Sequence, residues 1–398
     1  MRGKEPKEKG ITLIALVITV VILIILATVT LNVVLGEGGL IQRAQQAKEL
    51  TEQVQKDEQD ELKGAEEFIN GVLAGKGTTT TPIEEAKPNP SEDGPRFEDT
   101  TTITDDLENE VKIPGGFHLD KDSGTKVEEG IVIEDDSGNQ FVWIPVGEYK
   151  VSTSINSTGK LTNELSRRTF TNSGSTLVNG DDIIDTYYYG EGNTKYTSVA
   201  KDQIDAFKTS ATANKGFYIE RYEAGTETER TAKTDPLTMP LVQANKYPYV
   251  YVTRDQAKEQ AEAMYSGNKY VTSELTSSYA WDTALNFICQ TNEEGYKLAT
   301  TTDRTYGNTN TKNKTKTGAY TVNGEVSDKY SNIFDILGNC WEWTTEYSSN
   351  NVHSYCCVSR GGSYYNSNGY AAGRSVSGTS SSQYYDSFRI QLYINPTN

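Results

Sequence analysis

The sequence predicts an α+β domain preceded by a long N-terminal helix that crosses a membrane and continues as a stalk. Three observations lead to this prediction. Residues 11–35 carry no charged side chain, residues 40–73 repeat apolar side chains at the spacing of one helix face, and residues 113–398 mix strand, turn and helix patterns. We therefore divide the chain into a leader (1–10), a membrane segment (11–35), an amphipathic stalk helix (36–74), a disordered linker (75–112) and a folded domain (113–398).

The overall charge argues against one class of partner. With 38 basic and 55 acidic residues among 398, the chain carries a formal net charge of −17. An acidic surface repels phosphate groups, so we expect no nucleic acid partner. Tyrosine is frequent (25) whereas His (2) and Met (3) are rare, a mixture that suits β-rich, loop-rich surfaces outside the cell.

The uncharged run 11–35 is long enough to span a bilayer, since about 20 apolar residues suffice for a helix. Arg2, Lys4, Lys7 and Lys9 precede it, and basic residues stay on the cytoplasmic side. We therefore expect a single-pass protein of the cell membrane whose C-terminal domain lies on the outer surface. A buried core helix is the alternative.

The junction between Gly10 and Ile11 resembles the cleavage signal of type IV pilins and pseudopilins. The resemblance implies that a prepilin peptidase cuts after Gly10 and that Ile11 becomes the mature N-terminus. Pilins usually have a glutamate at the fifth mature position, where this chain has Ala15. Membrane insertion is unaffected by this departure, whereas assembly with pilin subunits into a filament stays open.

Two segments separate the membrane run from the domain. Residues 40–73 alternate apolar and charged side chains with helical periodicity, which predicts a stalk, with a short helix packed on its own domain as the alternative. Residues 75–112 are rich in Thr, Pro, Gly and acidic residues and contain few large apolar ones. That composition predicts a disordered linker.

Within residues 113–398, local patterns predict both strands and helices. Residues 131–146 read as a hairpin around a turn at 136–139, and residues 216–223 read as a strand. Residues 253–265 and 276–288 have the spacing of helices, and the polar stretch 300–328 reads as a loop. Strand and turn signals then continue to the C-terminus.

Four segments stand in a recognisable order: FYIERYE (217–223), NIFDILGNCWEW (332–343), RGGSY (360–364) and SFR (387–389). Together they resemble the formylglycine-generating-enzyme, or sulfatase-modifying-factor, superfamily. The resemblance implies a C-type-lectin-like fold over residues 113–398. The Trp side chains and the two glycines of these segments are expected to serve the structure rather than catalysis.

The same resemblance argues against an enzyme. The family's oxidase reaction needs two cysteines after the RGGS segment, and Asn366 and Ala371 stand at those positions. Neither residue can form a thiolate, so we expect neither copper nor catalysis. An enzyme of this family ranks third among the functional hypotheses.

The family also holds a structural calcium ion near the WEW strand. The resemblance implies Ca²⁺ ligands at Asp335, Gly338, Cys340 and Glu342, and oxygen ligands suit this ion. The alternative is that Asp335 and Glu342 are ordinary hydrogen-bonding residues.

The four cysteines show no zinc-binding spacing. They are Cys289, Cys340, Cys356 and Cys357. Either of the adjacent pair could bond to Cys289 or Cys340, and free thiols are the alternative.

The C-terminal stretch has the composition of a contact surface. Tyr, Ser, Gly and Asn occupy 20 of the 27 positions in residues 361–387. Antibody-like surfaces use rigid tyrosines for contact area and Ser, Gly and Asn for adaptable hydrogen bonds. The alternative is a flexible polar region in a structural domain.

Variable proteins of diversity-generating retroelements, which belong to the same superfamily, carry their mutable residues in this stretch. The resemblance implies the following ligand contacts: Tyr365, Asn366, Ser367, Asn368, Tyr370, Ser375, Ser377, Gln383, Tyr384, Tyr385 and Asp386. The leading hypothesis is a non-catalytic, surface-displayed protein that binds an extracellular protein or glycan. A minor pilin or pseudopilin is the second hypothesis.

Overall fold

The computed structural model describes residues 96–120, 122–178, 194–347, 357–366 and 369–396. Chain contacts define two units, and all of these residues belong to the second, Ala86–Asn398. The predicted leader, membrane segment and stalk, including Gly10 and Ile11, lie outside the described residues. Within the described part, no helix is long and apolar enough to cross a membrane.

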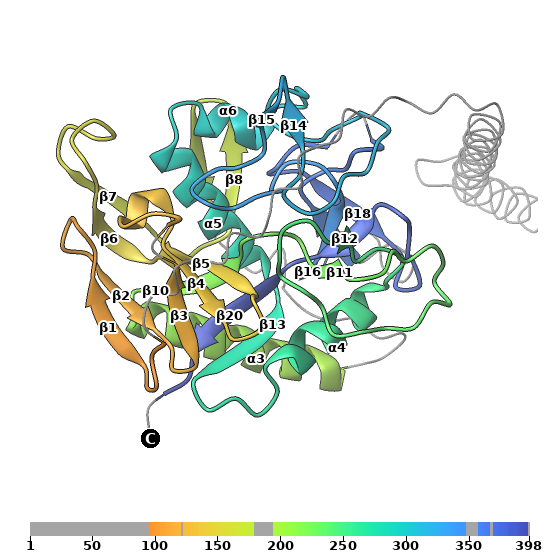
Figure 1. Ribbon diagram of the computed structural model, residues 1–398, viewed down its shortest axis with the longest axis horizontal. Coiled ribbons are helices and arrows are strands. Elements are labelled where there is room, and N and C mark those ends of the chain that lie inside the picture. Colours follow the sequence, from red (N-terminus) through yellow and green to blue (C-terminus); the bar gives the residue numbers. More distant parts are fainter. Residues whose placement is uncertain (1–95, 121, 179–193, 348–356, 367–368, 397–398) are drawn as a thin grey trace, which may run out of the picture. The chain divides into compact units, whose positions relative to one another are not determined.

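A six-stranded antiparallel sheet forms the centre of the domain (Figure 1). Its strands, in spatial order, are β13 (Val271–Leu275), β20 (Ile390–Ile394), β10 (Gly216–Glu220), β5 (Gln140–Pro145), β4 (Val132–Asp135) and β3 (Phe117–Asp120). The hairpin predicted over 131–146 is confirmed as β4 and β5. The Asp135 carboxylate accepts the N–H groups of Ser137 (2.8 Å) and Asn139 (2.9 Å) and so holds the turn between them.

In the described residues, four helices and one 3-10 turn accompany the strands: η1 (Val127–Glu129), α3 (Thr194–Ala213), α4 (Arg254–Met264), α5 (Ser278–Thr291) and α6 (Gly295–Thr300). The predicted helices at 253–265 and 276–288 are confirmed as α4 and α5. Thr253 caps α4 by accepting the Gln256 N–H, and Ser277 caps α5 in the same way. In Figure 1, α5 and α6 lie on the upper side of the long strands, and α3 and α4 lie on the lower side.

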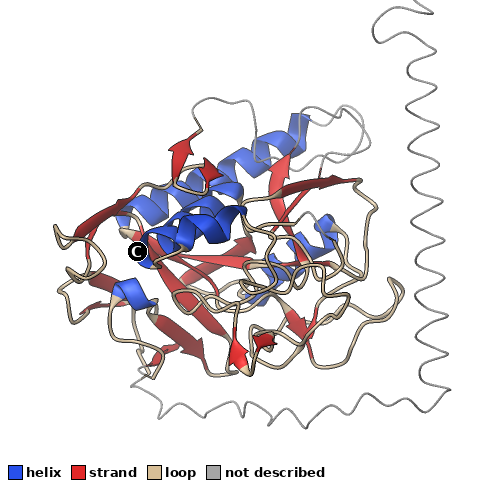
Figure 2. Cartoon of the chain, turned by 90° about the horizontal axis from the view of Figure 1, so that it is seen from above, coloured by secondary structure: helices blue, strands red, loops and turns tan. Residues whose placement is uncertain are grey.

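Helix α3 has no counterpart among the predicted elements. Its contact with the sheet includes Phe207, whose ring meets Phe217 of β10 at 5.1 Å and Tyr393 of β20 at 5.9 Å, and Ser210, which donates to the Ile394 carbonyl of β20 at 2.6 Å. Figure 2 shows the helices lying against the strands rather than apart from them. The domain is a mixed, sheet-rich α+β fold, as the sequence predicts.

A second, four-stranded sheet carries the C-terminal segments. Its spatial order is β18 (Arg374–Ser377), β17 (Cys357–Arg360), β16 (Trp341–Tyr347) and β19 (Asp386–Phe388). Strands β16 and β19 are parallel, with Trp341 opposite Asp386, whereas β17 is antiparallel to both of its neighbours. The connections 361–373 and 378–385 therefore both have an end at the edge where β16 begins.

The predicted linker is wrong for residues 96–112. These residues belong to the folded domain, where β1 (Thr101–Thr104) pairs with β2 (Glu110–Ile113). Val111 and Ile113 are fully buried, and the Asp105 carboxylate accepts N–H groups of the intervening turn. Each strand has only four residues, so two buried apolar side chains were too few to stand out from a polar background.

Short hairpins complete the described part of the fold. They pair β6 (Gly147–Lys150) with β7 (Lys160–Asn163), β8 (Arg168–Thr171) with β9 (Gly174–Leu177), β11 (Gly225–Thr226) with β12 (Tyr247–Pro248), and β14 (Thr321–Val322) with β15 (Glu325–Val326). The predicted loop 300–328 is irregular apart from the end of α6 and the small β14–β15 hairpin.

The aromatic residues of the WEW segment and its neighbours are structural, as expected. Trp343 is fully buried and donates to the Val252 carbonyl at 2.9 Å. Trp281 is also fully buried and donates to the Ala371 carbonyl at 3.1 Å. Both indoles therefore have a partner for their polar atom, as buried tryptophans require.

Candidate functional site

Five tyrosine rings gather beside the second sheet, and we call them the tyrosine cluster: Tyr251, Tyr364, Tyr365, Tyr384 and Tyr385. Tyr365 and Tyr385 stack with ring centres 5.6 Å apart and an interplanar angle of 4°. Tyr384 stands edge-on to both, at 5.4 Å from Tyr365 and 4.8 Å from Tyr385. Such ring pairs stabilise one another beyond their burial, so the cluster is a preformed surface.

The topology explains why residues distant in the sequence meet here. Tyr364 and Tyr365 follow β17, and Tyr384 and Tyr385 precede β19, which leaves both pairs at the edge where β16 begins. The Trp341 N–H donates to the Tyr385 carbonyl at 2.7 Å and joins β16 to that segment. The backbone thus brings the two tyrosine pairs together.

The rings differ in exposure. Tyr364 is buried, and burial raises the pKa of its phenol above the usual range. Tyr251, Tyr365, Tyr384 and Tyr385 are half-buried. Tyr364 therefore supports the other rings, which reach the surface.

A polar cavity of about 670 Å³ adjoins the cluster, and we call it the serine-lined cavity. Its lining residues are Thr231, Ala232, Lys233, Tyr251, Ser377, Gly378, Ser380, Ser381, Ser382 and Gln383. Tyr251 belongs to both features, since its N–H donates to the Gln383 carbonyl at 3.0 Å and its ring lies 6.5 Å from Tyr384. The cavity and the cluster are parts of one surface.

Several predicted contacts lie on this surface. Tyr365, Tyr384 and Tyr385 belong to the cluster, and Ser377 and Gln383 line the cavity.

The other predicted contacts lie around it or elsewhere. Asn366 is half-buried beside Ser363, Ser375 is half-buried on β18, and Tyr370 is 38% exposed. Ser367 and Asn368 lie outside the described residues.

Asp386 was predicted to contact a ligand, but the structure buries its side chain. It lies on β19, paired with Trp341 of β16, and is only 3% exposed. Burial raises the pKa of Asp386 to about 7. An acidic residue in a polar stretch suggested a surface position, whereas the parallel strand pairing places this carboxyl beneath the surface.

Sequence reasoning missed three residues of the surface. Tyr251 follows β12, Lys233 lies in the long connection before it, and Lys312 lies in the polar loop after α6. The Lys312 ammonium lies 4.3 Å from the centre of the Tyr365 ring and donates to the Tyr365 carbonyl at 2.5 Å. None of these residues carries a local signal, because each reaches the surface through tertiary folding.

Arg374, which also lies in the C-terminal stretch, is scaffold. It donates to Asp282 at 2.7 Å and to Glu346 at 2.8 Å. The fully buried Arg360 donates to the same Asp282 at 2.6 Å. This ionic network fixes the two strands from which the connection 361–373 departs.

Of the side chains predicted to hold calcium, Glu342 has partners within the protein for both of its oxygens, whereas the buried Oδ1 of Asp335 has none. Glu342 is fully buried, and its two oxygens accept from Arg389 at 2.6 and 2.8 Å. Asp335 accepts the Gly318 N–H at 2.7 Å, and the Gly338 N–H donates to the Gly361 carbonyl at 2.9 Å. In the part of the chain described, no three His, Cys, Asp or Glu side chains group so as to hold a metal ion. Glu342 is thus poorly placed as a ligand, and the calcium site stays a prediction.

The positions compared with the family's catalytic cysteines are not reactive. Ala371 is fully buried and Asn366 is an amide. Cys289 and Cys340 are buried and form no disulfide in the described residues, and burial raises the pKa of both thiols. Raised thiol pKa values keep cysteines protonated and inert. Cys357 is buried on β17, and Cys356 lies outside the described residues.

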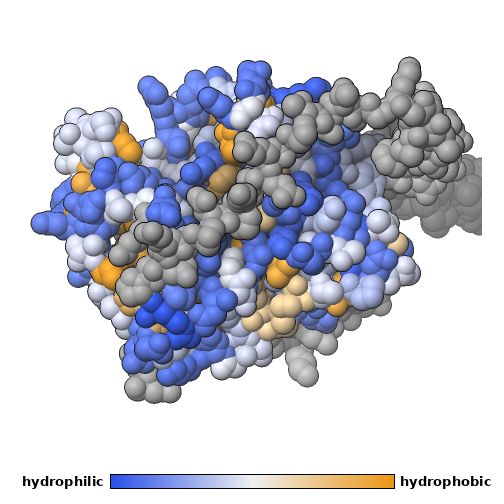
Figure 3. All heavy atoms as spheres, viewed as in Figure 1, coloured by the Kyte–Doolittle hydropathy of each residue, from blue (hydrophilic) through white to orange (hydrophobic). Residues whose placement is uncertain are grey.

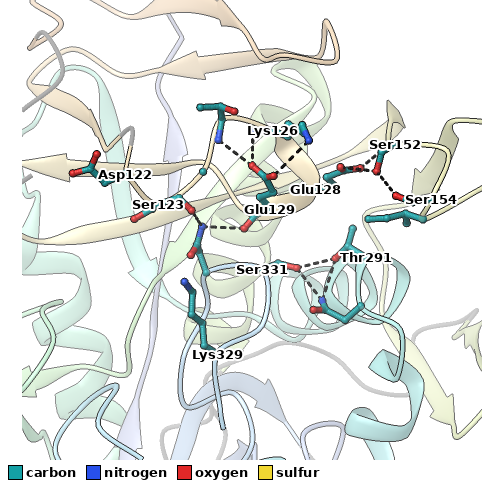
Figure 4. Close-up of a pocket in the computed structure, with 15 residues that line it drawn as sticks. Asp122, Ser123, Lys126, Glu128, Glu129, Ser152, Ser154, Thr291, Lys329 and Ser331 are labelled. Atoms are coloured by element: carbon teal, nitrogen blue, oxygen red, sulfur yellow. Dashed lines mark hydrogen bonds and ion pairs between the residues drawn. The ribbon is translucent and has the colours of Figure 1, made fainter. Parts of the chain in front are cut away.

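A second hollow, of about 730 Å³, lies between η1, the segment after β6 and the end of α5 (Figure 4). Several of its polar groups bond to one another or to the backbone around it. Asn332 donates to the carbonyls of Glu129 (2.9 Å) and Gly130 (2.7 Å), and the Glu128 carboxylate accepts from the N–H and hydroxyl of Ser152. These bonds give the hollow a structural role in joining three segments.

The visible face in Figure 3 is mostly hydrophilic, with small and separate hydrophobic patches. The exposed large hydrophobic residues of the described chain are Leu177, Met239, Val326, Tyr370 and Val376. They come from several segments, so we expect polar and aromatic side chains to make any ligand contact.

No family model matches the chain, and no curated protein matches it in sequence. Among solved structures, it is similar to CarF, with 14% identity and a TM-score of 0.33 over 54% of this chain and 97% of that one. It is also similar to variable protein 1 of Treponema denticola, with 12% identity and a TM-score of 0.29 over 54% and 94% of the two chains. The third similar structure is PvdO from Pseudomonas aeruginosa, with 12% identity and a TM-score of 0.33 over 66% of this chain and 97% of that one. Similarity this low carries no argument about the function of this chain. The function is therefore inferred from the geometry of the site.

Proposed function

We propose that the chain displays a non-catalytic ligand-binding domain of C-type-lectin-like type at the cell surface. The tyrosine cluster and the serine-lined cavity form its contact surface. One observation carries the proposal: half-buried tyrosines from two separate connections pack ring against ring beside a polar cavity.

The geometry suits binding because the rings are already ordered. Tyrosine offers a large amphipathic contact area and loses little side-chain freedom on binding. Contacts among Tyr365, Tyr384 and Tyr385 hold these side chains before a ligand arrives, which lowers the entropy cost of association. The serine hydroxyls of the cavity add hydrogen-bonding groups beside the rings.

Two further parts of the proposal rest on the sequence. Residues 11–35 would anchor the chain after cleavage between Gly10 and Ile11 by a prepilin peptidase. The C-terminal stretch would be diversified by a retroelement, which a template repeat and a reverse transcriptase gene beside this gene would support. A role as minor pilin depends on the same N-terminal segment and stays a prediction.

The proposal is tested by replacing two rings of the cluster in the full-length chain displayed on cells. Binding of the cells to printed arrays of proteins and glycans is compared for the unchanged chain and for Tyr384→Ala/Tyr385→Ala. We expect array binding to fall by about a hundredfold, or about 2.7 kcal/mol, which is a loss of the size seen when hot-spot side chains of an interface are truncated.

The matched control is Tyr270→Ala, which removes a half-buried tyrosine at the edge of the other sheet. Equal surface amounts of each variant exclude a folding defect. Array signals that survive the double replacement unchanged would show that the cluster is not the contact surface.

A further inference from the structure

Two lysines place positive charge beside the tyrosine cluster, on a chain whose formal net charge is −17. The exposed Lys312 lies over the Tyr365 ring at 4.3 Å, and the exposed Lys233 lines the serine-lined cavity. Neither lysine has a carboxylate partner among the described residues. The loop 308–324, which contains Lys312, has no acidic residue at all.

Carboxylates in neighbouring segments are already engaged by other lysines. Glu229 pairs with Lys314 at 3.2 Å, and Glu227 pairs with Lys246 at 2.5 Å. Within each pair the two charges offset each other, so neither glutamate is bonded to Lys233 or Lys312.

Two more acidic groups lie close by. The Asp235 carboxylate accepts the N–H groups of Thr231 (2.7 Å) and Ala232 (3.0 Å). Asp386 is buried beneath the cluster. Lys233 and Lys312 are therefore two cations of the contact surface to which no carboxylate is bonded among the described residues, and hydrogen-bond donors surround them.

The ring geometry favours a peptide over a sugar. Sugars stack flat on an open aromatic face, but Tyr385 stacks on Tyr365 and the Lys312 ammonium lies over the same ring. Tyr384 stands edge-on to its neighbours. Ring edges and ammonium groups suit carboxylates and peptide carbonyls, which accept hydrogen bonds.

From this charge distribution we infer that the surface takes an acidic peptide segment of a partner protein, whose carboxylates pair with Lys233 and Lys312. This inference rests on the proposed function and adds the chemical class of its ligand. Charge complementarity of this kind selects partners and speeds their encounter.

The test uses the full-length chain on cells and a phage library of random 12-residue peptides. We expect captured peptides to be enriched in Asp and Glu relative to the input library. For the double charge reversal Lys233→Glu/Lys312→Glu, we expect binding of those acidic peptides to fall about tenfold or more and the enrichment to shift to Lys and Arg.

The chain offers a closely matched control in Lys269. Its ammonium also lies 4.3 Å from the centre of a tyrosine ring, that of Tyr270 at the edge of the other sheet, and lies 3.9 Å from the exposed Asp99 carboxylate. Lys269→Glu reverses one lysine on another face, half the charge change of the double reversal, and should leave the enrichment unchanged.

Three outcomes would overturn the inference. The first is that captured peptides show no enrichment in Asp and Glu. The second is that Lys269→Glu abolishes the enrichment as fully as the double reversal does. The third is that the displayed chain retains polygalacturonate, an acidic sugar polymer, but retains no peptide. If array binding still depends on Tyr384 and Tyr385 in those cases, the proposed function stands and only the ligand class is wrong.

Discussion

At the scale of single residues, the base of the contact surface depends on buried ion pairs. Arg360 and Arg374 both donate to Asp282, which is fully buried at the start of α5. Two strands that flank the connection 361–373 are thus tied to one helix by a single carboxylate. A buried charge that loses its partner is strongly destabilising, because the other charge stays desolvated.

Asp282→Asn is therefore expected to lower the free energy of unfolding by about 3–5 kcal/mol. Chemical denaturation of the full-length protein measures the change. Glu148→Gln is the control, since Glu148 pairs with Lys160 on the surface, where its side chain is 61% exposed, and exposed pairs contribute under about 1 kcal/mol. Equal losses in the two variants would contradict the role of the buried network.

At the scale of elements, the sequence predicted those segments that carry their own start and stop signals. Helices α4 and α5 begin at capping Thr253 and Ser277, and the β4–β5 hairpin closes on an Asp-rich turn. Helix α3 escaped prediction because few apolar side chains, Phe207 among them, contact the sheet from a largely polar segment. The β1–β2 pair escaped prediction because it also buries few apolar side chains within a largely polar segment.

The candidate site was predictable only in part, and for a related reason. Tyr365, Tyr384 and Tyr385 lie in a stretch of unusual composition that is visible in the sequence. Tyr251 and Lys312 come from segments far away in the chain, and only the pairing of β16 with β17 and β19 brings the tyrosine pairs to one place. Composition locates a contact stretch, whereas tertiary folding selects which side chains share its surface.

The connection 361–373 depends on two glycines that pass close to each other. Gly362 has a φ of +84°, and a Cβ there would lie 2.7 Å from the Gly369 Cα atom. Gly362→Ala should therefore displace the connection and weaken array binding at least tenfold, with a smaller effect on global unfolding.

Gly174→Ala, at a glycine whose added Cβ would meet nothing within 4 Å, is the control for that variant. Array binding that Gly362→Ala leaves intact would show that the connection need not keep this path.

At the scale of the whole molecule, buried carboxyl groups make stability depend on pH. Burial raises the pKa of Glu274 and Asp386 to about 7 each. The folded chain holds these protons more tightly than the unfolded chain, whose carboxyl groups titrate near pH 4. The resulting stabilisation is complete below that pH and is lost as the pH rises through about 7.

We therefore expect the free energy of unfolding to be greater at pH 5 than at pH 8, and the dependence to be shallower in Asp386→Asn. Denaturant titrations at several pH values measure both slopes. Stability that increases from pH 5 to pH 8 would contradict the assignment of these groups as protonated in the fold.

The central claim is that the tyrosine cluster contacts the ligand, and hydroxyl-radical footprinting of the displayed chain tests it most directly. Labelling is compared with and without a ligand identified on the arrays. The account predicts that oxidation of Tyr365, Tyr384 and Tyr385 falls when the ligand binds, whereas that of Tyr270 does not change. Unchanged oxidation of all three cluster tyrosines under saturating ligand would contradict the account.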